Sequence, residues 1–556
     1  MNGQTSTLLP LTPIQQGMLF HHLAHPGSGV DIEQIHCSVD GTLDPEALQG
    51  AWQEVVARHP ALRARFLWED REDPAQELLD DVFVPVRTED WRQRSGESRE
   101  AALAALLDEA RARGFDLPQA PCMRVTAIRT DEARWELLWT VHHIVCDGRS
   151  FPLVLAEVFA FHDAARGAGT APADPAPSFA QHVERLLAGE DRDAEAFWQE
   201  RLRGFDSPTP LPAAPVAEAP TGRGERVRIL DEKTTARLSA FCSEHDLSLN
   251  YLLQGAWALL LGRLAGEREV VFGATRAGRA HSGDRADAIV GCLINTLPVR
   301  TSVTGRETVS AWLQALRTRE RAVRDHEQTP LMAVQGWSEV GAGQALFESL
   351  IVFDHQILDS QMKACGPAFA DRTFRLLERT NYPLTLYAYG EPQFVLKLAF
   401  DEPRFDETAA DRLLELLEHL LVTLADGPDA SIDEVALVPA ADRERLLTTW
   451  NSTSTPYPET ECIHESIQAR AARHPDAPAL IHRGRATSYG ELNRRANRLA
   501  HHLAGLGVHA LARGNVFVWS DVDRLALGPG RARAAEAVHC RQRDAGVDEG
   551  AAGLGP

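Results

Sequence analysis

The chain has 556 residues, of which 44% are apolar and 24% are charged, and its formal net charge at pH 7 is -22. This length corresponds to about three or four folding units, and the apolar share is ample for buried cores. The acidic balance argues against nucleic acid or an anionic membrane as a partner, and no basic patch interleaved with aromatic residues is present.

The sequence indicates neither secretion nor a structural metal. Its start, MNGQTSTLLPLTP, lacks the cationic region and apolar core of a secretory signal, and no 18-residue apolar run predicts a membrane span. Eight cysteines are scattered singly with no CxxC pair, which argues against a zinc site and a disulfide framework. We therefore expect a cytoplasmic protein without a bound metal.

Helix and strand patterns alternate along the chain, as expected for an α/β protein. The first clear helix begins at Asp44-Pro45, and its apolar positions share one side: Leu48, Trp52, Val55 and Val56. A strand-like run follows at residues 134–141 and leads directly into HHIVCDG at residues 142–148. Strand geometry places His142 and His143 on opposite faces, so only one of them can face a given cavity.

The HHIVCDG segment combines groups that suit proton transfer. An imidazole has an ordinary pKa of about 6.5, so a positioned histidine is the usual general base for an amine or hydroxyl nucleophile. Asp147 either orients the imidazole, as in a catalytic triad, or pairs with an arginine and holds the loop. We favour the second interpretation, because a loop that turns back after a strand needs an anchor. Gly148 permits a positive φ and leaves a backbone N–H free to donate to an oxyanion.

Two further features near this motif have ordinary interpretations. Cys146 is interpreted as a small buried residue and not as a nucleophile. The other histidine pairs, at residues 21–22 and 501–502, lack the Asp-Gly that completes the motif, so we interpret them as surface or core residues.

Downstream of the motif the apolar spacing becomes helical, with Ser150 as the expected N-cap and Pro152 in the first turn. Proline-rich stretches at 171–177 and 208–220 are typical of extended connectors, and we expect the first to separate two lobes. The remaining strong elements are a largely apolar helix at 248–264 and strands at 269–275 and 394–401.

HHIVCDG resembles the HHxxxDG motif of the condensation domains of nonribosomal peptide synthetases, which fall within the chloramphenicol acetyltransferase-like superfamily. Six flanking blocks resemble family blocks in the family's order: LTPIQQGMLFH (11–21), RHPALRARF (58–66), IVGCLINTLPVR (289–300), RDHEQTPL (324–331), LFESLIVFDH (346–355) and ERTNYPLTL (378–386). The resemblance extends over nearly all of residues 8–445, and with this many blocks in order it is very specific.

The resemblance implies an α/β fold of the chloramphenicol acetyltransferase type, a two-lobed V-shaped pseudo-dimer with a channel between the lobes. We expect an N-terminal lobe at 8–175 and a C-terminal lobe at 176–445. Donor and acceptor carrier proteins would approach the channel from opposite mouths, each presenting a thioester on a 4'-phosphopantetheine arm. The acceptor's amine would attack the donor thioester carbonyl and form an amide. No carrier attachment motif occurs in the chain, so both partners are expected in trans, and no cofactor bound by the chain itself is expected.

The resemblance also implies roles for individual residues. The candidate catalytic set is His143, His142, Asp147 and Gly148, with Arg279 and Asn295 as channel or structural residues. His143 would be the base or would position the amine, while His142 is expected to be packed. Asp147 would pair with Arg279, and Asn295 would line the site; the alternatives are a surface arginine and a buried, hydrogen-bonded asparagine. Arg149 departs from the family, since many members have an aromatic residue there, and it alters either the channel or the local packing.

The C-terminal part differs in character. Residues 446–463 are expected to be a linker, and residues 464–508 resemble the first segment of an adenylation domain, with a helical apolar stripe of Leu492, Ala496, Leu499, Leu503 and Leu506. Three lysines accompany 54 arginines among the 57 basic residues, which suggests a GC-rich gene. The hypothesis is that residues 509–556 are an aberrant or disordered tail that follows a frameshift. The chain contains no Gly-rich, Lys-containing phosphate loop, so ATP use is not predicted.

Amide formation between two carrier-bound acyl groups is therefore the leading function. An epimerization domain, which shares the histidine motif, is the alternative. It is disfavoured because the Asn-Thr block reads GCLINTLPVR and because an adenylation-like segment follows. A third hypothesis is a catalytically silent member that recruits partners.

Overall fold

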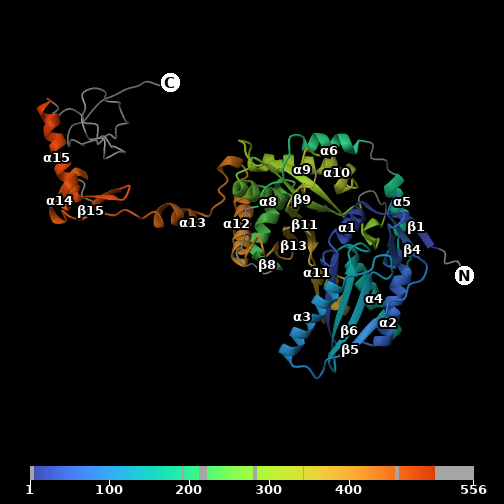
Figure 1. Ribbon diagram of the computed structural model, residues 1–556. Coiled ribbons are helices and arrows are strands. Elements are labelled where there is room, and N and C mark those ends of the chain that lie inside the picture. Colours follow the sequence, from blue (N-terminus) through green and yellow to red (C-terminus); the bar gives the residue numbers. More distant parts are fainter. Residues whose placement is uncertain are drawn as a thin grey trace. The chain divides into compact units, whose positions relative to one another are not determined.

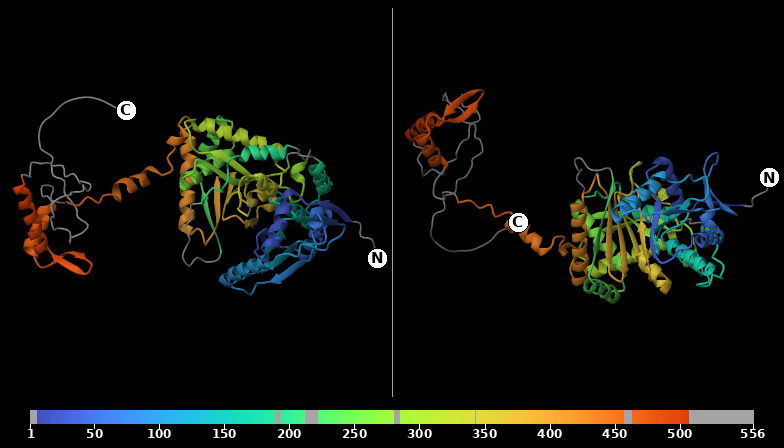
Figure 2. Two further views of the ribbon diagram at one scale, coloured as in Figure 1. Left: turned by 45° about the horizontal axis from the view of Figure 1, so that its top comes forward. Right: turned by 90° about the horizontal axis from the view of Figure 1, so that it is seen from below.

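The computed structural model describes residues 6–188, 193–211, 222–279, 285–341, 343–456 and 463–506. The chain divides into two compact units, Met1–Arg445 and Leu446–Pro556. The first unit contains two large sheets and a small three-stranded one, and Figures 1 and 2 show helices packed on the large sheets. In the described residues no helix is both long enough and apolar enough to span a bilayer.

The first sheet carries the HHIVCDG segment at one end. Its strands lie in the order β12 (Arg372–Leu377), β2 (Ile32–Asp40), β7 (Arg134–His142), β6 (Met123–Asp131) and β5 (Val86–Asp90). All neighbours are antiparallel except β5 and β6. The helices packed on this sheet are α2 (Pro45–Arg58), α4 (Ser150–Ala165) and α3 (Gly96–Arg113). Beside it are α1 (Pro13–Ala24), α5 (Phe179–Ala188) and the small sheet of β1 (Ser6–Pro10), β4 (Ala75–Leu79) and β3 (Ala64–Leu67).

Alternation along β2 and β7 decides which residues enter the core of this half. Odd-numbered positions face α2 and α4, and the indole rings of Trp52 and Trp139 lie 5.2 Å apart there. Even-numbered positions face α3, where the Gln34 side chain donates to the Leu107 carbonyl at 2.8 Å. The strand period of two therefore separates a core face from a face covered by a single helix.

The second sheet is mixed. Its strands lie in the order β10 (Asn295–Ser302), β9 (Glu269–Arg276), β11 (Ser349–Gln356), β13 (Leu384–Glu391), β14 (Val395–Asp401) and β8 (Arg223–Ile229), and β11 is parallel to both β9 and β13. One face packs on α7 (Glu232–Glu244), α8 (Leu249–Ala265), α9 (Val309–Ala322) and α12 (Glu407–Asp426). Part of the other face packs on α6 (Ala194–Leu202) and α10 (Leu331–Trp337).

One segment of the second half crosses to the first half. After β11 the chain leaves the second sheet, forms α11 (Leu358–Ala364) and then adds β12 to the edge of the first sheet, before it returns as β13. Leu358, Met362 and Phe374 belong to the first hydrophobic core. The lobe boundary at 175/176 stays a prediction, and residues 358–377 pack with the first half. This crossing pairs the free edge of β2, which would otherwise expose unpaired backbone groups.

Several local predictions are confirmed. Asp44 is the N-cap of α2, where its carboxylate accepts the backbone N–H groups of Glu46 and Ala47 at 3.0 and 3.2 Å. The apolar helix predicted at 248–264 is α8, and it is buried from Leu252 to Gly262. The strands predicted at 269–275 and 394–401 are β9 and β14.

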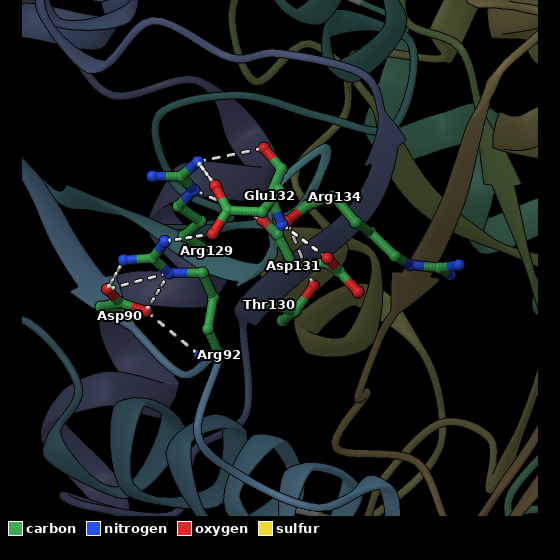
Figure 3. A network of polar contacts seen from close by, with 7 residues as sticks. All are labelled: Asp90, Arg92, Arg129, Thr130, Asp131, Glu132 and Arg134. Carbon is green, nitrogen blue, oxygen red and sulfur yellow. Dashed lines mark hydrogen bonds and ion pairs between the residues drawn. The ribbon is translucent and has the colours of Figure 1, made fainter.

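Far from His142, the other end of β7 is fixed by a surface ion network at the β6–β7 turn (Figure 3). Arg92 contacts Asp90 at 2.7 Å and Glu132 at 2.5 Å, and Glu132 also contacts Arg129 at 2.7 Å. The Thr130 hydroxyl donates to the Arg134 carbonyl at 3.2 Å within the same turn. Exposed ion pairs of this kind contribute little stability singly, but here they join β5 to the hairpin that carries the histidines.

The second unit contains α14 (Ile463–Arg473), β15 (Pro478–His482), β16 (Arg485–Ser488) and α15 (Tyr489–Gly505); the short helix α13 (Ala440–Glu444) closes the first unit. Among the described residues of the second unit, Ala471 is the one buried apolar side chain. Near the end of α15, Leu503 and Leu506 are 39% and 67% exposed. The apolar stripe predicted on this helix is therefore present without being buried. The tail predicted at 509–556 and most of the proline-rich stretch at 208–220 lie outside the described residues.

Candidate functional site

The two histidines at the end of β7 have different surroundings, as the strand period predicts. His142 is 2% exposed, its Nδ1 accepts the backbone N–H of Ile144 at 3.2 Å, and its ring lies 5.8 Å from that of His22. Burial, together with the neighbouring histidines, lowers the pKa of His142 to about 3. His142 is thus a neutral, packed side chain at physiological pH.

His143 is half-buried and lines a cavity of about 340 Å³. Its backbone N–H donates to the Asp31 carbonyl at 2.7 Å, which extends the β2–β7 ladder by one pair. Its ring contacts that of Phe151 at 6.2 Å, and its Nδ1 has no hydrogen-bond partner in the part of the chain that is described. The imidazole is therefore held by its backbone and by packing beside the cavity, with a buried Nδ1 that no described residue satisfies.

Asp147 is the anchor of the loop. Its two carboxylate oxygens each accept a guanidinium N–H of Arg279 at 2.9 Å, and they also accept the backbone N–H groups of Leu293 at 3.0 Å and Ser150 at 3.2 Å. Burial alone would raise the pKa of Asp147, but the Arg279 charge and these hydrogen bonds hold it below its ordinary value. The predicted ion pair is present. These bonds tie the carboxylate to its own loop and to the second half, so they match the arginine-anchor interpretation and not the triad.

Two details of the loop differ from prediction. Ser150 is the first residue of α4 and does not cap it, because its hydroxyl donates to the Asp147 carboxylate at 3.0 Å and lies 3.0 Å from the Gly291 carbonyl. Gly148 lines the cavity but does not have a positive φ. The Asp147 network therefore sets the turn geometry, and the glycine leaves open space where a Cβ would point.

Arg149, the departure from the family pattern, also lines the cavity, and its guanidinium lies 3.0 Å from the Asp287 carboxylate of the second half. Both side chains are substantially exposed, at 42% and 83%. Cys146 is fully buried, and burial raises the pKa of its thiol well above the ordinary value. A protonated, inaccessible thiol is not a nucleophile, which agrees with its interpretation as a packing residue.

Asn295 lines the cavity from the second half, but its amide is fully used. Its nitrogen donates to the carbonyls of Glu327 at 2.9 Å and Thr329 at 2.8 Å, and its oxygen accepts the backbone N–H of Thr296 at 3.0 Å. It is 1% exposed. Asn295 therefore lines the cavity, as the resemblance implies. It is also buried and hydrogen-bonded, as the alternative interpretation has it, and its role is to shape the wall.

The cavity brings together segments that are distant in sequence. The first half contributes α1, the start of β2 and the histidine loop; the second half contributes the ends of β9 and β10, α10, β11, the segment 378–382 and Tyr387 of β13. Sequence reasoning missed several polar residues of this wall, among them His21, Asp31, Glu33 and Tyr387. His21 belongs to the pair at 21–22, which from the sequence alone we interpret as surface or core residues. Its position in the family-like block LTPIQQGMLFH is the signal that could have identified it. Nothing local marks the other three.

Among the described residues no group of three or more His, Cys, Asp or Glu side chains could hold a metal ion. Four acidic side chains line the cavity, Asp31, Glu33, Asp354 and Glu378. Burial raises the pKa of Asp31 to about 7, and burial together with the Glu378 and Asp31 carboxylates raises the pKa of Glu33 well above its ordinary value.

Comparison with known proteins extends over most of the chain. A family model of condensation domains matches residues 5–447, and one of AMP-binding enzymes matches residues 467–522, which continues past Val508. One of the subunits of linear gramicidin synthase from Brevibacillus parabrevis is 37% identical over 516 residues, covering 91% of this chain and 10% of that protein. Bacitracin synthase 1 of Bacillus licheniformis is 28% identical, covering 91% and 10%. The chain thus spans about a tenth of the length of these relatives.

Solved structures share the fold. A four-domain nonribosomal peptide synthetase bound to AMP and glycine superposes with a TM-score of 0.71 at 18% identity, covering 92% of this chain and 39% of that one. The starter condensation domain of rhizomide synthetase gives a TM-score of 0.64 at 19% identity, covering 78% and 100%. The predicted chloramphenicol acetyltransferase-like α/β fold is confirmed. With its family model matched over residues 5–447, this chain belongs to the condensation domain family of nonribosomal peptide synthetases, a family of acyltransferases, followed by the start of an AMP-binding domain.

Proposed function

We propose that the chain forms an amide between a donor acyl or peptidyl thioester and the amine of an aminoacyl thioester, each carried on the phosphopantetheine arm of a separate carrier protein. The observation that supports this most directly is the cavity between the two halves, into which His143 brings an imidazole with an unpartnered Nδ1. A base or hydrogen-bond acceptor placed at the meeting point of two substrates suits aminolysis of a thioester.

In the proposed reaction the amine nitrogen attacks the thioester carbonyl carbon, the C–N bond forms, and the C–S bond breaks. One proton leaves the nitrogen, and the departing thiolate gains one, so the step is balanced without an added reagent. His143 accepts a hydrogen bond from the amine, which orients the lone pair, and it is the group placed to take up the proton. The backbone N–H of Gly148 is a candidate donor to the oxyanion.

In this proposal Asp147 acts indirectly, through the position of His143. Its bonds to Arg279 and Leu293 tie the histidine loop to the second half, so the position of His143 in the cavity depends on an ion pair that is itself buried. Asn295 keeps the opposite wall in place through its three backbone hydrogen bonds. Arg279 and Asn295 are therefore proposed to position the site and not to react.

The test is a loading assay with two separate carrier domains, one charged with an acyl group and one with an amino acid, followed by mass spectrometry of the carrier-bound products. A new amide on the acceptor carrier supports the proposal. An aminoacyl group with an inverted α-carbon would indicate epimerization, and two unchanged carriers would indicate a silent, partner-recruiting module.

A further inference from the structure

Three polar atoms without partners belong to side chains that line one cavity. They are Glu33 Oε2, Tyr387 Oη and His143 Nδ1, and none of them has a hydrogen-bond partner among the residues that the structure describes. Glu33 is 3% exposed and Tyr387 is 2% exposed. Buried polar groups in native proteins are almost always paired, so this set points to a ligand that completes it.

Strand register puts two carboxylates next to His143. The bond from the His143 N–H to the Asp31 carbonyl makes these two residues opposite one another, and Glu33 lies opposite Val141. Asp31, just before β2, Glu33 and His143 all line the same cavity. Diagonal neighbours across two strands are about 7–8 Å apart at Cβ, so one small group in the cavity can lie between Glu33 and His143.

The arginine near Glu33 is already engaged elsewhere. The Arg111 guanidinium donates to the carbonyls of Gly29 at 3.2 Å and Leu377 at 2.9 Å, and also to that of Ile32. The Arg111 charge lowers the pKa of Glu33. This effect is smaller than the increase caused by burial and smaller than the increase caused by the Glu378 carboxylate. Glu33 thus carries a carboxylate that Arg111 does not neutralise by direct contact.

The neighbouring acids differ in their partners. Glu378 contacts Lys397 at 3.4 Å, and Lys397 also lies 3.7 Å from Glu225. Within the described part of the chain the ionic partner of Asp31 is His21, at 4.0 Å, and burial lowers the pKa of that imidazole, which favours its neutral form. Asp31 and Glu33 consequently lack a permanent cation in direct contact among the described residues, and a cationic ligand would relieve both carboxylates.

We propose that Asp31 and Glu33 form a subsite for a primary ammonium group and hold it beside His143, with the Tyr387 hydroxyl as a further acceptor. An ammonium carries three donors in a compact, strongly charged head, which matches acceptors on two strands of one half and one strand of the other. The inference rests on the proposed function, since the ammonium is supplied by the acceptor substrate. Its source is either the α-ammonium of the acceptor, which passes one proton to a carboxylate of the subsite before the neutral amine attacks, or an ammonium on the acceptor's side chain.

The central experiment compares Glu33→Gln with the wild type in the full chain, with glycyl N-acetylcysteamine thioester as the acceptor. Loss of a carboxyl group that can ionise against the ammonium, at nearly constant shape, is expected to raise the KM for this acceptor by about 10- to 100-fold and to leave the KM for the donor unchanged. Glu136→Gln is the matched control, because Glu136 lies on the opposite face of the same sheet, bonded to His36 and Ser38. An acceptor KM that Glu33→Gln leaves unchanged for both the glycyl and the ornithyl thioester overturns the subsite.

A second acceptor tests whether charge is the recognised feature. The glycolyl thioester has a hydroxyl in place of the amine, so Glu33→Gln should bind it as the wild type does. An equal loss for the glycyl and glycolyl thioesters would show a change of cavity shape and would overturn the proposal. The ornithyl thioester separates the two sources: an equal loss for glycyl and ornithyl indicates the α-ammonium, and a loss confined to ornithyl indicates the side-chain ammonium.

Calorimetric titration of the same thioesters separates this inference from the proposed function. If the wild type forms no amide but binds the glycyl thioester about 10-fold or more tightly than Glu33→Gln does, the subsite stands and the proposed reaction falls. Equal binding of both the glycyl and the ornithyl thioester by the two proteins removes the subsite whatever the activity. Should Glu33→Gln fail to fold, Asp31→Asn gives the same comparison, because asparagine tolerates the φ of 62° at that position.

Discussion

His143 differs from the histidine beside it by one position in a strand, and this decides its chemistry. His142 points into packing and is neutral, whereas His143 lines the cavity with an unpartnered ring nitrogen. Because side chains alternate between the two faces of a strand, the sequence predicts that the two histidines point in opposite directions. Which of the two faces met the cavity depended on the second half of the molecule, and the family resemblance supplied that assignment.

Replacing His143 with alanine is expected to lower turnover by about 10² to 10⁴, the usual effect of losing a proton-transfer group. The measurement is the rate of amide formation between the two carriers at saturating substrate, with thermal unfolding recorded for the same samples. An unaltered unfolding temperature with near-normal turnover would remove His143 from the reaction.

Asp31 gives a prediction about pH. Burial raises its pKa from 3.8 to about 7, so the folded protein keeps this proton over a range in which the unfolded chain has lost it. For an acid whose folded pKa is raised, stability falls as pH rises through that window. Between pH 5 and pH 8 the wild type should therefore lose about 2 to 3 kcal/mol of unfolding free energy that Asp31→Asn does not lose.

Urea unfolding at the two pH values checks this expectation. Asp70→Asn is the matched control, because Asp70 has a similar φ of 55° and is exposed. Parallel pH trends in the wild type and Asp31→Asn would mean that Asp31 is not the source of the loss.

At the scale of elements, the loop between β7 and α4 is held mainly by one buried carboxylate. Asp147 accepts hydrogen bonds from Arg279, Leu293 and Ser150, and Arg279 is itself only 5% exposed. The arginine was expected from the resemblance. The contribution of Leu293 was not, because a backbone donor leaves no mark in a sequence.

Asp147→Ala should cost about 3–5 kcal/mol of unfolding free energy, since it leaves the Arg279 charge buried and unpaired. Asp287→Ala removes the comparable but exposed partner of Arg149 and should cost no more than about 1 kcal/mol. Denaturant unfolding of both variants provides the comparison. Similar small losses in the two would show that the Asp147 pair does not hold the halves together.

Single elements were predicted well where the sequence pattern is local. The cap at Asp44, the buried helix α8 and strand β7 all follow from neighbours within a few turns of chain. Ser150 failed as a cap because its hydroxyl bonds to Asp147 and Gly291, and Gly291 lies 141 positions away. A competing tertiary hydrogen bond overrode a sound local preference.

At the scale of the whole molecule, the proposed site is contained in one unit. Both large sheets, the cavity and the Asp147 network lie within Met1–Arg445. A protein shortened to residues 1–456 should therefore form amide at a rate within about twofold of the full chain and unfold at the same temperature. A fall of tenfold or more in the carrier assay would mean that residues beyond 456 contribute to the reaction.

The sequence by itself determined what depends on neighbouring residues: the histidine motif, the opposite facing of its two imidazoles, the main helices and strands, and the family. Only the tertiary structure decided that β12 crosses to the first sheet and that Asp31, Glu33 and Tyr387 meet at one wall with His143. Those placements depend on strand register between segments more than 100 and 240 positions apart. Register is set by packing and pairing across the whole fold, and no short-range pattern encodes it.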